Sequence, residues 1–273
     1  MISFPNAKIN LGLNITGKRP DGFHNLETVF FPVGWCDALE FALANEFQFT
    51  TSGIPIAGDQ ELNLVVKAYR LFQKEYNLPT LKIHLHKNIP FGAGLGGGSS
   101  DAAFMLRMMN KTFSLEISEA EMLAYAAHLG SDCSFFILNK PVFATGRGEI
   151  MWSIDVSLNG MFILLVKPPT EVSTQKAFQF IVPRKSETSL PELLQLPVQE
   201  WKGKIQNQFE ESVFQQFPEI EEIKKKLYQQ GAVYASMSGS GSCVFGIFNE
   251  YPSSLTDLFP APFLTFSQKI NIL

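Results

Sequence analysis

The sequence predicts an α+β protein built from two domains. Its 273 residues exceed the roughly 100–200 residues of a typical single domain. Hydrophobic residues make up 45% of the chain and 25 residues are phenylalanine, which is ample material for packed cores. Strand-like and helix-like spacing of apolar residues both occur in each half, without the regular strand–helix alternation of a doubly wound sheet. We expect a first domain over residues 1–152 and a second over residues 153–273.

The first half contains both kinds of pattern. Apolar residues fall on every second position from Ala7 to Ile15, which predicts a half-buried strand with Lys8 and Asn10 on its other face. The segment 19–22 places Pro and Gly as a turn requires. The other elements expected here are strand-like sequence up to residue 51, a helix at 61–77, a strand at 81–85, a helix from 99 to about 113, and a helix opened by a capping box at 118–121 and ended by Gly130.

The second half begins with a strand predicted by the apolar run 161–167. A serine at position 173 is placed to open a short helix, and Pro218 and Gly231 are placed to open and close a longer one. The other elements expected are a polar connection at 183–203, helices at 205–216 and 218–230, and strands at 233–237 and 243–248 around a tight loop at 238–242.

Charge and composition argue against several classes of protein. The formal net charge is -4, so no broad basic surface is expected, and nucleic acid is not an expected partner. The longest strongly apolar run, residues 161–166, is far shorter than the roughly 20 residues of a membrane span. The three cysteines are widely spaced and form no CxxC pair, which predicts reduced thiols. A cytoplasmic protein without a membrane partner is therefore expected.

A glycine-rich run between a predicted strand and a predicted helix is the main candidate for a ligand site. Glycines allow backbone N–H groups to approach phosphate oxygens, and the positive end of the following helix favours an anion. Ordering five glycines also costs conformational entropy, which favours a functional loop over a flexible linker. We expect this run to bind the phosphates of ATP through Pro90, Phe91, Gly92, Ala93, Gly94, Leu95, Gly96, Gly97, Gly98, Ser99 and Ser100.

Two familiar phosphate-binding motifs do not explain this run. A Walker A loop requires a lysine after its last glycine, and no lysine lies anywhere in 88–106. Gly92, Gly94 and Gly97 satisfy the GxGxxG spacing of a dinucleotide-binding turn. In such a turn, however, the first glycine follows the strand directly, whereas residues 88–91 separate them here. A different kind of phosphate loop is therefore expected.

Five motifs in matching order along the chain resemble the GHMP kinase superfamily. They are Asn6–Leu11, Pro20–His24, Pro90–Ala103, Gly130–Asp132 and Met237–Phe245. Within the superfamily the chain is similar to members whose acceptor alcohol carries a cytidine diphosphate. The resemblance implies a two-domain fold with the active site in the cleft between the domains. It also implies phosphorylation, by ATP with Mg²⁺, of the 2-hydroxyl of a methylerythritol unit in non-mevalonate isoprenoid synthesis.

The resemblance also implies roles for particular residues. Lys8 and Asp132 match the catalytic pair, with Asp132 acting as base toward the acceptor hydroxyl. Asn10 and His24 match positions that read the cytosine edge, and two aromatic residues match positions that sandwich its ring. The full set of implied substrate-binding residues is Asn10, Phe23, His24, Thr174, Phe178, Ser238, Gly239, Ser240 and Gly241. No carboxylate pair is placed by its spacing to bind the magnesium ion.

Two other functions are open at this point. The chain could be a GHMP kinase for another small alcohol, such as mevalonate or homoserine, although a base sandwich would be useless to such an acceptor. It could also be a nucleotide-binding regulator without catalysis. The presence of both Lys8 and Asp132 argues against the second alternative.

Overall fold

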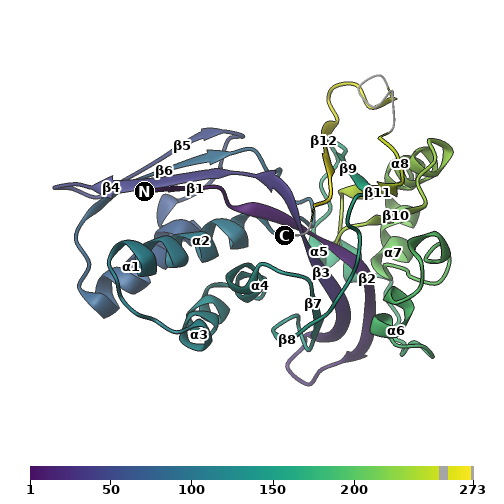
Figure 1. Cartoon of the computed structure of the whole chain (residues 1–273), viewed down its shortest axis with the longest axis horizontal. Coiled ribbons are helices and arrows are strands. Elements are labelled where there is room, and N and C mark those ends of the chain that lie inside the picture. Colours follow the sequence, from purple (N-terminus) through teal and green to yellow (C-terminus); the bar gives the residue numbers. More distant parts are fainter. Residues whose placement is uncertain (252–257, 272–273) are drawn as a thin grey trace. The chain divides into compact units, whose positions relative to one another are not determined.

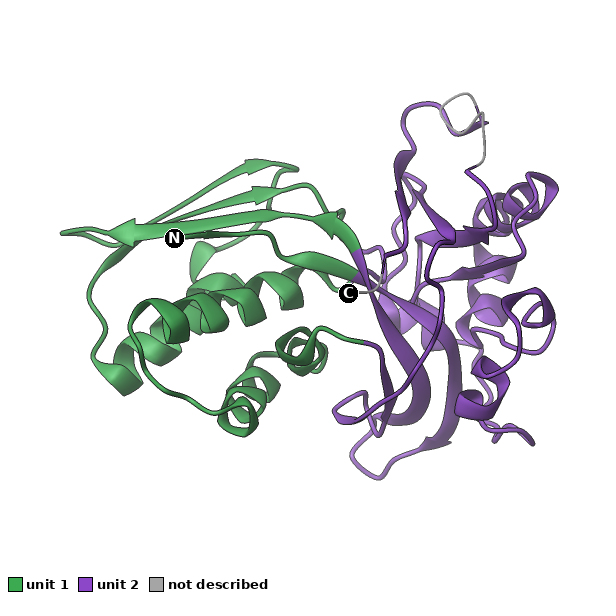
Figure 2. Cartoon of the chain, in the orientation of Figure 1, with its two compact units in different colours: residues 1–7, 34–91, 96–140 green, residues 8–33, 92–95, 141–273 purple. Residues whose placement is uncertain are grey.

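The computed structural model describes residues 1–251 and 258–271, and Figure 1 shows their strands and helices. The chain forms two compact units, each assembled from several segments (Figure 2). Unit 1 contains residues 1–7, 34–91 and 96–140, and unit 2 contains residues 8–33, 92–95 and 141–273. The glycine-rich run therefore contributes residues to both units. The predicted domain boundary near residue 152 stays a prediction.

Unit 1 consists of a four-stranded sheet and four helices. The sheet has the order β1 (Ile2–Ser3), β4 (Ala38–Leu43), β6 (Leu81–Lys87), β5 (Gln48–Gly53). The β5–β6 pair is parallel, whereas β6 pairs with β4 and β4 with β1 in antiparallel fashion. The helices are α1 (Leu64–Tyr76), α2 (Gly97–Thr112), α3 (Glu119–Leu129) and α4 (Cys133–Leu138), and a 3₁₀ turn at Gln60–Leu62 precedes α1. Helices α1 and α2 lie along one face of the sheet, where the alternate residues of β6 are buried (Figure 1).

Unit 2 contains two further four-stranded sheets. One has the order β2 (Asn6–Lys18), β3 (His24–Cys36), β7 (Val142–Thr145), β8 (Ile150–Ser153), and the ends of β2 and β3 belong to unit 1. The other has the order β10 (Tyr234–Met237), β11 (Val244–Phe248), β9 (Phe162–Lys167), β12 (Leu264–Lys269) and is antiparallel throughout. Helices among its described residues include α5 (Thr174–Phe178), α6 (Leu190–Leu194), α7 (Phe209–Gln216) and α8 (Pro218–Gln229), and a 3₁₀ turn lies at Val198–Glu200.

One apolar core joins the second sheet of unit 2 to its helices. Ile220, Ile223 and Leu227 of α8 pack against buried residues of β9, β10 and β11. Leu13 and Ile15 of β2 belong to the same cluster. The core therefore connects β2, which carries Lys8 and Asn10, to the sheet in which β10 and β11 flank the loop 238–242.

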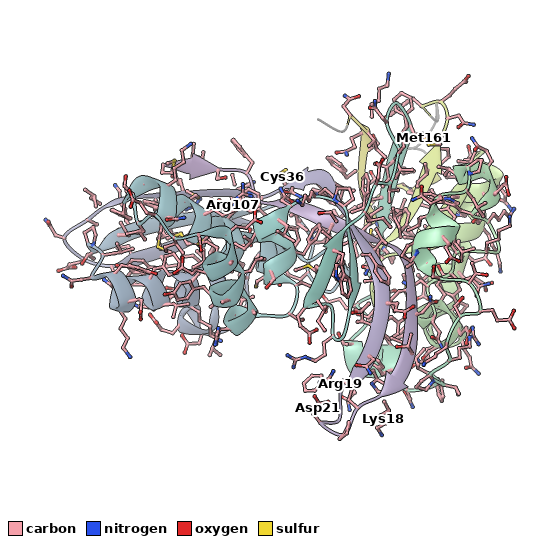
Figure 3. The ribbon with its side chains drawn as sticks, turned by 60° about the horizontal axis from the view of Figure 1, so that its bottom comes forward. Lys18, Arg19, Asp21, Cys36, Arg107 and Met161 are labelled. Atoms are coloured by element: carbon pink, nitrogen blue, oxygen red, sulfur yellow. The ribbon has the colours of Figure 1, made fainter. Side chains whose placement is uncertain are left out.

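The predicted turn at 19–22 connects β2 to β3. The Arg19 backbone N–H donates to the Phe23 carbonyl over 2.8 Å, and the Arg19 guanidinium lies 2.9 Å from the Asp21 carboxylate. Figure 3 shows Lys18, Arg19 and Asp21 together at this end of the two strands. The capping box is confirmed as well, because Ser118 and Glu121 bond each other's backbone N–H groups at the start of α3.

Several expectations about secondary structure were wrong. The polar face of β2 is not solvated, because Lys8 and Asn10 are only 3% and 2% exposed. The helix after the glycine run starts at Gly97 rather than at residue 99. The connection 183–203 contains α6, a helix of five residues whose apolar pattern is too short to detect in the sequence. Strands β7, β8 and β12 and helix α4 were not predicted either, and all four are also short.

Candidate active site

Lys8 is a buried lysine in β2. Its Nζ donates hydrogen bonds to Asn10 Oδ1 over 2.7 Å and to the Gly94 carbonyl over 2.9 Å. Its backbone N–H donates to the Leu95 carbonyl over 3.0 Å. A buried ammonium group is tolerated only where oxygen atoms replace its water shell. The polar face of β2 is therefore covered by the glycine-rich run.

Asn10 is held in one orientation by its neighbours. Its Oδ1 accepts the bond from Lys8, and its Nδ2 donates to Thr28 Oγ1 over 2.9 Å. Thr28 in turn donates to the Gly12 carbonyl over 2.6 Å. Thr28 was missed in the sequence, because a lone threonine in a strand carries no distinctive signal. These bonds fix the side chain of Asn10 beside the Lys8 ammonium.

The two predicted glycine loops are hydrogen-bonded to each other within unit 2. Ser238 Oγ donates to the Gly94 carbonyl over 2.8 Å, and the Ser242 N–H donates to the Gly92 carbonyl over 3.1 Å. Gly94 has a φ of +70°, and a Cβ there would lie 1.9 Å from the Ser238 carbonyl oxygen. Only glycine fits at this contact. The Gly94 carbonyl thus receives both the Lys8 ammonium and the Ser238 hydroxyl.

Asn207 is a second residue that was missed in the sequence. Its Nδ2 donates to the carbonyls of Met237 and Gly239 over 2.8 and 2.7 Å, and its Oδ1 accepts the Phe209 N–H. The segment containing it pairs with β2, because the Gln208 N–H donates to the Leu13 carbonyl over 2.8 Å. An asparagine before a helix looks like an ordinary cap in the sequence. Its carbonyl partners are visible only in the structure.

Helix α2 begins with an uncapped turn in unit 1. Its N-cap residue, Gly96, has a left-handed backbone and makes no side-chain cap hydrogen bond. A Cβ placed on Gly98 would meet no atom within 4 Å. The first N–H groups of a helix have no partner within the helix, and together with its dipole they favour an anion. This turn therefore fits the phosphate groups of a nucleotide.

Asp132 also lies beside the start of α2 in unit 1. It is half-buried and occupies the N-cap position of α4. The next residue, Cys133, contacts the Ser99 hydroxyl in the first turn of α2. Burial raises the pKa of the Cys133 thiol to about 11, with a smaller opposing effect from Ser99. The thiol is therefore protonated at neutral pH, and its contact with Ser99 brings the residue after Asp132 next to the first turn of α2.

The aromatic residues implied by the resemblance are only partly brought together. His24 stacks on Phe178, with ring centroids 4.6 Å apart and an interplanar angle of 20°. The edge of Phe178 also meets Phe209. Phe23 is 55% exposed, and the Arg147 guanidinium lies 5.0 Å from its ring centroid. The sandwich of cytosine between Phe23 and Phe178 stays a prediction.

The remaining implied contacts lie in two places in unit 2. Thr174 is the first residue of α5, and Ser173 caps that helix through the Lys176 N–H. Ser238, Gly239, Ser240 and Gly241 form the loop between β10 and β11. That loop is closed by a bond from the Gly241 N–H to the Ser238 carbonyl over 3.0 Å.

No metal cluster and no membrane helix were found in the part of the chain that the structure describes. Within residues 1–251 and 258–271, no group of three His, Cys, Asp or Glu residues is placed to bind a metal ion. No helix in these ranges has the length and apolar content to cross a bilayer. His84 and His86, which share a face of β6, are bridged by hydrogen bonds to the Ser52 hydroxyl.

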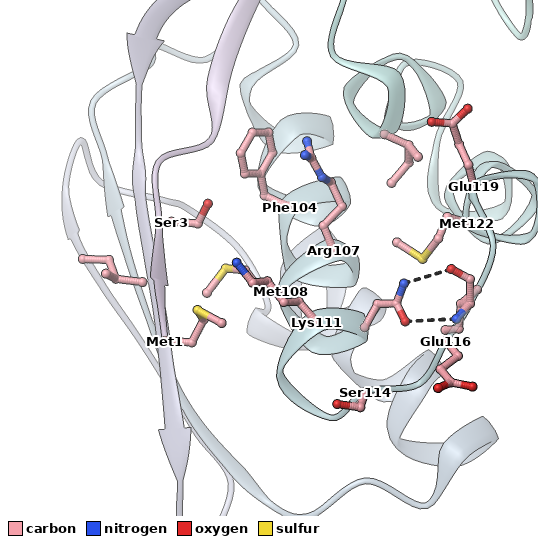
Figure 4. Close-up of a pocket in the computed structure, with 14 residues that line it drawn as sticks. Met1, Ser3, Phe104, Arg107, Met108, Lys111, Ser114, Glu116, Glu119 and Met122 are labelled. Atoms are coloured by element: carbon pink, nitrogen blue, oxygen red, sulfur yellow. Dashed lines mark hydrogen bonds between the residues drawn. The ribbon is translucent and has the colours of Figure 1, made fainter.

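A cavity of about 800 Å³ lies elsewhere in unit 1, beside β1, α2 and α3 (Figure 4). Met108 and Met122 contribute apolar surface to it, and Arg107 and Glu119 contribute opposite charges. None of the predicted site residues lines this cavity. It is therefore separate from the glycine-rich run and from Lys8.

Two sequence families match this chain. The family of GHMP kinases N terminal domains matches residues 63–140, and the GHMP kinases C terminal family matches residues 191–255. The first range contains the whole glycine-rich run together with Asp132. The second contains Asn207 and the loop 238–242.

Whole-chain comparisons agree with these matches. The 4-diphosphocytidyl-2-C-methyl-D-erythritol kinase of Bacteroides thetaiotaomicron is 58% identical over 252 residues, covering 91% of this chain and 92% of the relative. The kinase of the same name from Bacteroides fragilis is 56% identical over 253 residues with the same coverage. A crystal structure of 4-(cytidine 5'-diphospho)-2C-methyl-D-erythritol kinase has a TM-score of 0.83 and 27% identity, covering 98% of both chains. The mevalonate kinase of Methanococcus jannaschii, at 14% identity and a TM-score of 0.71 over 99% of this chain and 98% of that one, shares the fold alone. This chain belongs to the GHMP kinase family and, within it, to the 4-diphosphocytidyl-2-C-methyl-D-erythritol kinases.

Proposed function

We propose that this kinase transfers a phosphoryl group from ATP to the 2-hydroxyl of 4-diphosphocytidyl-2-C-methyl-D-erythritol. The products are the 2-phosphate and ADP. One observation carries the proposal: the buried Lys8 ammonium and the loop 238–242 both bind the Gly94 carbonyl in the glycine-rich run. Three motifs that are far apart in the sequence thus form one polar site of the kind that phosphoryl transfer needs.

ATP is the phosphate donor in this proposal. The first turn of α2 and residues Pro90–Ser100 bind its phosphates through backbone N–H groups. Mg²⁺ accompanies the nucleotide and neutralises charge on the phosphate oxygens. This ion typically keeps several waters and is held largely by the substrate's own phosphates.

Lys8 and Asp132 act on the acceptor. Asp132 orients the 2-hydroxyl and accepts its proton as the oxygen attacks the γ-phosphorus. Lys8 holds the same hydroxyl and offsets the negative charge that develops on the transferred group. The hydrogen bonds from Lys8 to Asn10 and Gly94 support this role, because they hold the ammonium group in one position before the reaction begins.

The remaining residues implied by the resemblance bind the cytidine group and the rest of the acceptor in this proposal. Phe23 and Phe178 stack on the cytosine ring and His24 bonds to its polar edge, whereas Asn10 reaches that edge only by exchanging its bonds to Lys8 or Thr28. Thr174 and the loop residues Ser238, Gly239, Ser240 and Gly241 contact the acceptor near the transferred phosphate. The His24–Phe178 stack brings two of these residues together and offers an aromatic surface, on which the cytosine would take the place of the His24 ring. The meeting of ATP and acceptor in a cleft between two domains stays a prediction.

Phosphorus NMR of the protein with MgATP and 4-diphosphocytidyl-2-C-methyl-D-erythritol tests the proposal. A phosphomonoester signal and ADP should appear together. Asp132→Asn should slow the reaction by about 100- to 10,000-fold, the range for losing a general base. Lys8→Ala should lower the rate as strongly, whereas Lys18→Ala should not, because Lys18 is exposed at the far end of the same strand.

The same experiment separates this function from the alternatives. Mevalonate and homoserine, offered as acceptors, should give no phosphomonoester. Product from either of them would assign the chain to a kinase for another alcohol. ATP binding without any product would identify a nucleotide-binding regulator. An active Asp132→Asn variant would remove Asp132 from the role of base.

A further inference from the structure

We propose that Lys87 is a positioning residue for ATP, because its buried ammonium joins the strand before the glycine-rich run to the helix after it. The inference rests on the proposed binding of ATP phosphates at the start of α2. Lys87 is the last residue of β6 and is 1% exposed. Its Nζ donates to Asp37 Oδ2 and, over 2.7 Å, to Asp101 Oδ2. Asp37 and Asp101 are themselves only 1% and 2% exposed.

Asp37 fixes the chain where it leaves β6. Its Oδ1 accepts the backbone N–H groups of Asn88 and Ile89 over 2.6 and 2.8 Å. These residues lead directly into Pro90 at the start of the glycine-rich run. Asp37 therefore holds both the Lys87 ammonium and the first residues of the loop.

Asp101 fixes the chain where it enters α2. It follows Ser100, which is fully buried and whose Oγ has no hydrogen-bond partner. Lys87 also lies close to the helix backbone, because a Cβ on Gly97 would be 3.3 Å from the Lys87 Nζ. The ammonium thus touches the first turn of α2, where the N–H groups for the phosphates lie.

The two anchors enclose the flexible part of the loop. Lys87 and Asp101 are 14 positions apart, and the five glycines lie between them. Glycine loses more conformational freedom on ordering than any other residue, so a glycine-rich loop needs fixed ends to keep one shape. The hydrogen bond between Lys87 and Asp101 holds the two ends of the loop at a fixed distance from each other.

The charges of this group argue for positioning rather than for stability alone. Buried ion pairs are often no more stabilising than apolar residues of the same size, because removing the charges from water is costly. Asp101 Oδ1 also lacks a hydrogen-bond partner, which is a further cost. An apolar contact would close the loop at less cost but would not fix α2 in one register against β6. The directed bonds of Lys87 do so.

Calorimetric titration with ATP tests this inference, and it needs no acceptor. Lys87→Met should weaken the Kd for ATP by about tenfold or more, as expected when backbone contacts to the phosphates are misplaced. The KM for the acceptor should stay within about twofold of its value in the natural protein, because the proposed acceptor contacts do not include Lys87. Lys82→Met is the matched control, since Lys82 lies on the same strand and is exposed. It should leave the Kd unchanged.

A second variant covers the case in which Lys87→Met fails to fold. Lys87→Arg keeps the cation between the two carboxylates, so it should fold. The larger guanidinium cannot fit beside Gly97 without moving the first turn of α2, and the Kd for ATP should still weaken several-fold. A purely structural role would lower the fraction of protein that binds ATP and leave the Kd of that fraction unchanged.

The outcomes separate this inference from the proposed function. Unchanged Kd in any folded variant at position 87 would overturn the inference while leaving the kinase assignment intact. Tight ATP binding by the natural protein without product would overturn the proposed acceptor, yet the effect of Lys87 on the Kd would still be measured. A natural protein that does not bind ATP would refute both.

Discussion

Asp101 differs from an ordinary aspartate because its carboxyl group is buried at the start of α2. Burial raises its pKa to about 8 from an ordinary value of 3.8, and the nearby Asp37 carboxylate acts in the same direction. The Lys87 ammonium opposes both effects without cancelling them. The folded protein therefore holds a proton on Asp101 more readily than the unfolded chain does, while the bond from Lys87 favours the ionised form.

This raised pKa predicts how stability changes with pH. The unfolded chain releases the proton near pH 4, so the proton stabilises the folded state below that pH, and the contribution is lost as the pH rises to about 8. Asp101→Asn removes the titrating group. The free energy of unfolding of the natural protein, relative to that of the variant, should therefore fall between pH 5 and pH 8, by at most about 1.4 kcal/mol per pH unit.

Urea denaturation at several pH values measures this difference. Comparing two proteins cancels the contributions of the titrating groups that lie far from Asp101. Parallel pH profiles for the natural protein and Asp101→Asn would show that Asp101 is ionised at neutral pH.

At the scale of elements, the loop 238–242 depends on a segment that lies outside it. The Asn207 amide donates to the carbonyls of Met237 and Gly239, at the last residue of β10 and in the loop itself. Glu210 of α7 adds a bond from the Met237 N–H over 2.8 Å. The start of α7 thus holds the loop in the shape that contacts Gly94.

Replacing Asn207 should therefore destabilise the protein. Asn207→Ala leaves two buried carbonyls without this donor, which should lower the free energy of unfolding by about 1–3 kcal/mol. Chemical denaturation measures the loss. Gln206→Ala is the control, because the neighbouring Gln206 side chain is exposed, and it should change stability by less than about 0.5 kcal/mol. Equal stability of the two variants would show that Asn207 does not anchor the loop.

At the scale of the whole molecule, the fold matches the predicted α+β architecture of the GHMP kinases. The glycine-rich run contributes to both compact units, and so do β2 and β3. A ligand on this run would bind only the folded chain, because Lys8 and Ser238, which lie far away in the sequence, hold the run in shape. Binding and folding should then be linked.

Nucleotide should accordingly raise the stability of the whole protein. MgATP at 100 times its Kd should increase the free energy of unfolding by about 2.7 kcal/mol. Thermal melting at rising nucleotide concentration measures the effect. AMP lacks the β- and γ-phosphates and should stabilise the protein much less at the same concentration. No shift with MgATP, or an equal shift with AMP, would contradict phosphate binding by the glycine-rich run.

Much of the candidate site could be predicted from the sequence because its motifs are local. The period of β2 placed Lys8 and Asn10 on one face, and the glycine spacing indicated a phosphate loop before α2. Thr28, Lys87 and Asn207 were missed, because each acts through partners between 14 and 50 positions away. A side chain that bonds to a distant backbone leaves no periodic signal in the sequence.

The sequence by itself thus determined the fold class, the two glycine loops and the strand that carries Lys8. These features follow from local backbone preferences and from the spacing of apolar residues, which act over a few positions. Only the tertiary structure decided that the polar face of β2 is buried, that both loops meet at Gly94, and that Lys87 lies between two carboxylates. Burial and hydrogen-bond partners depend on which distant segments pack together, and that is a property of the folded chain.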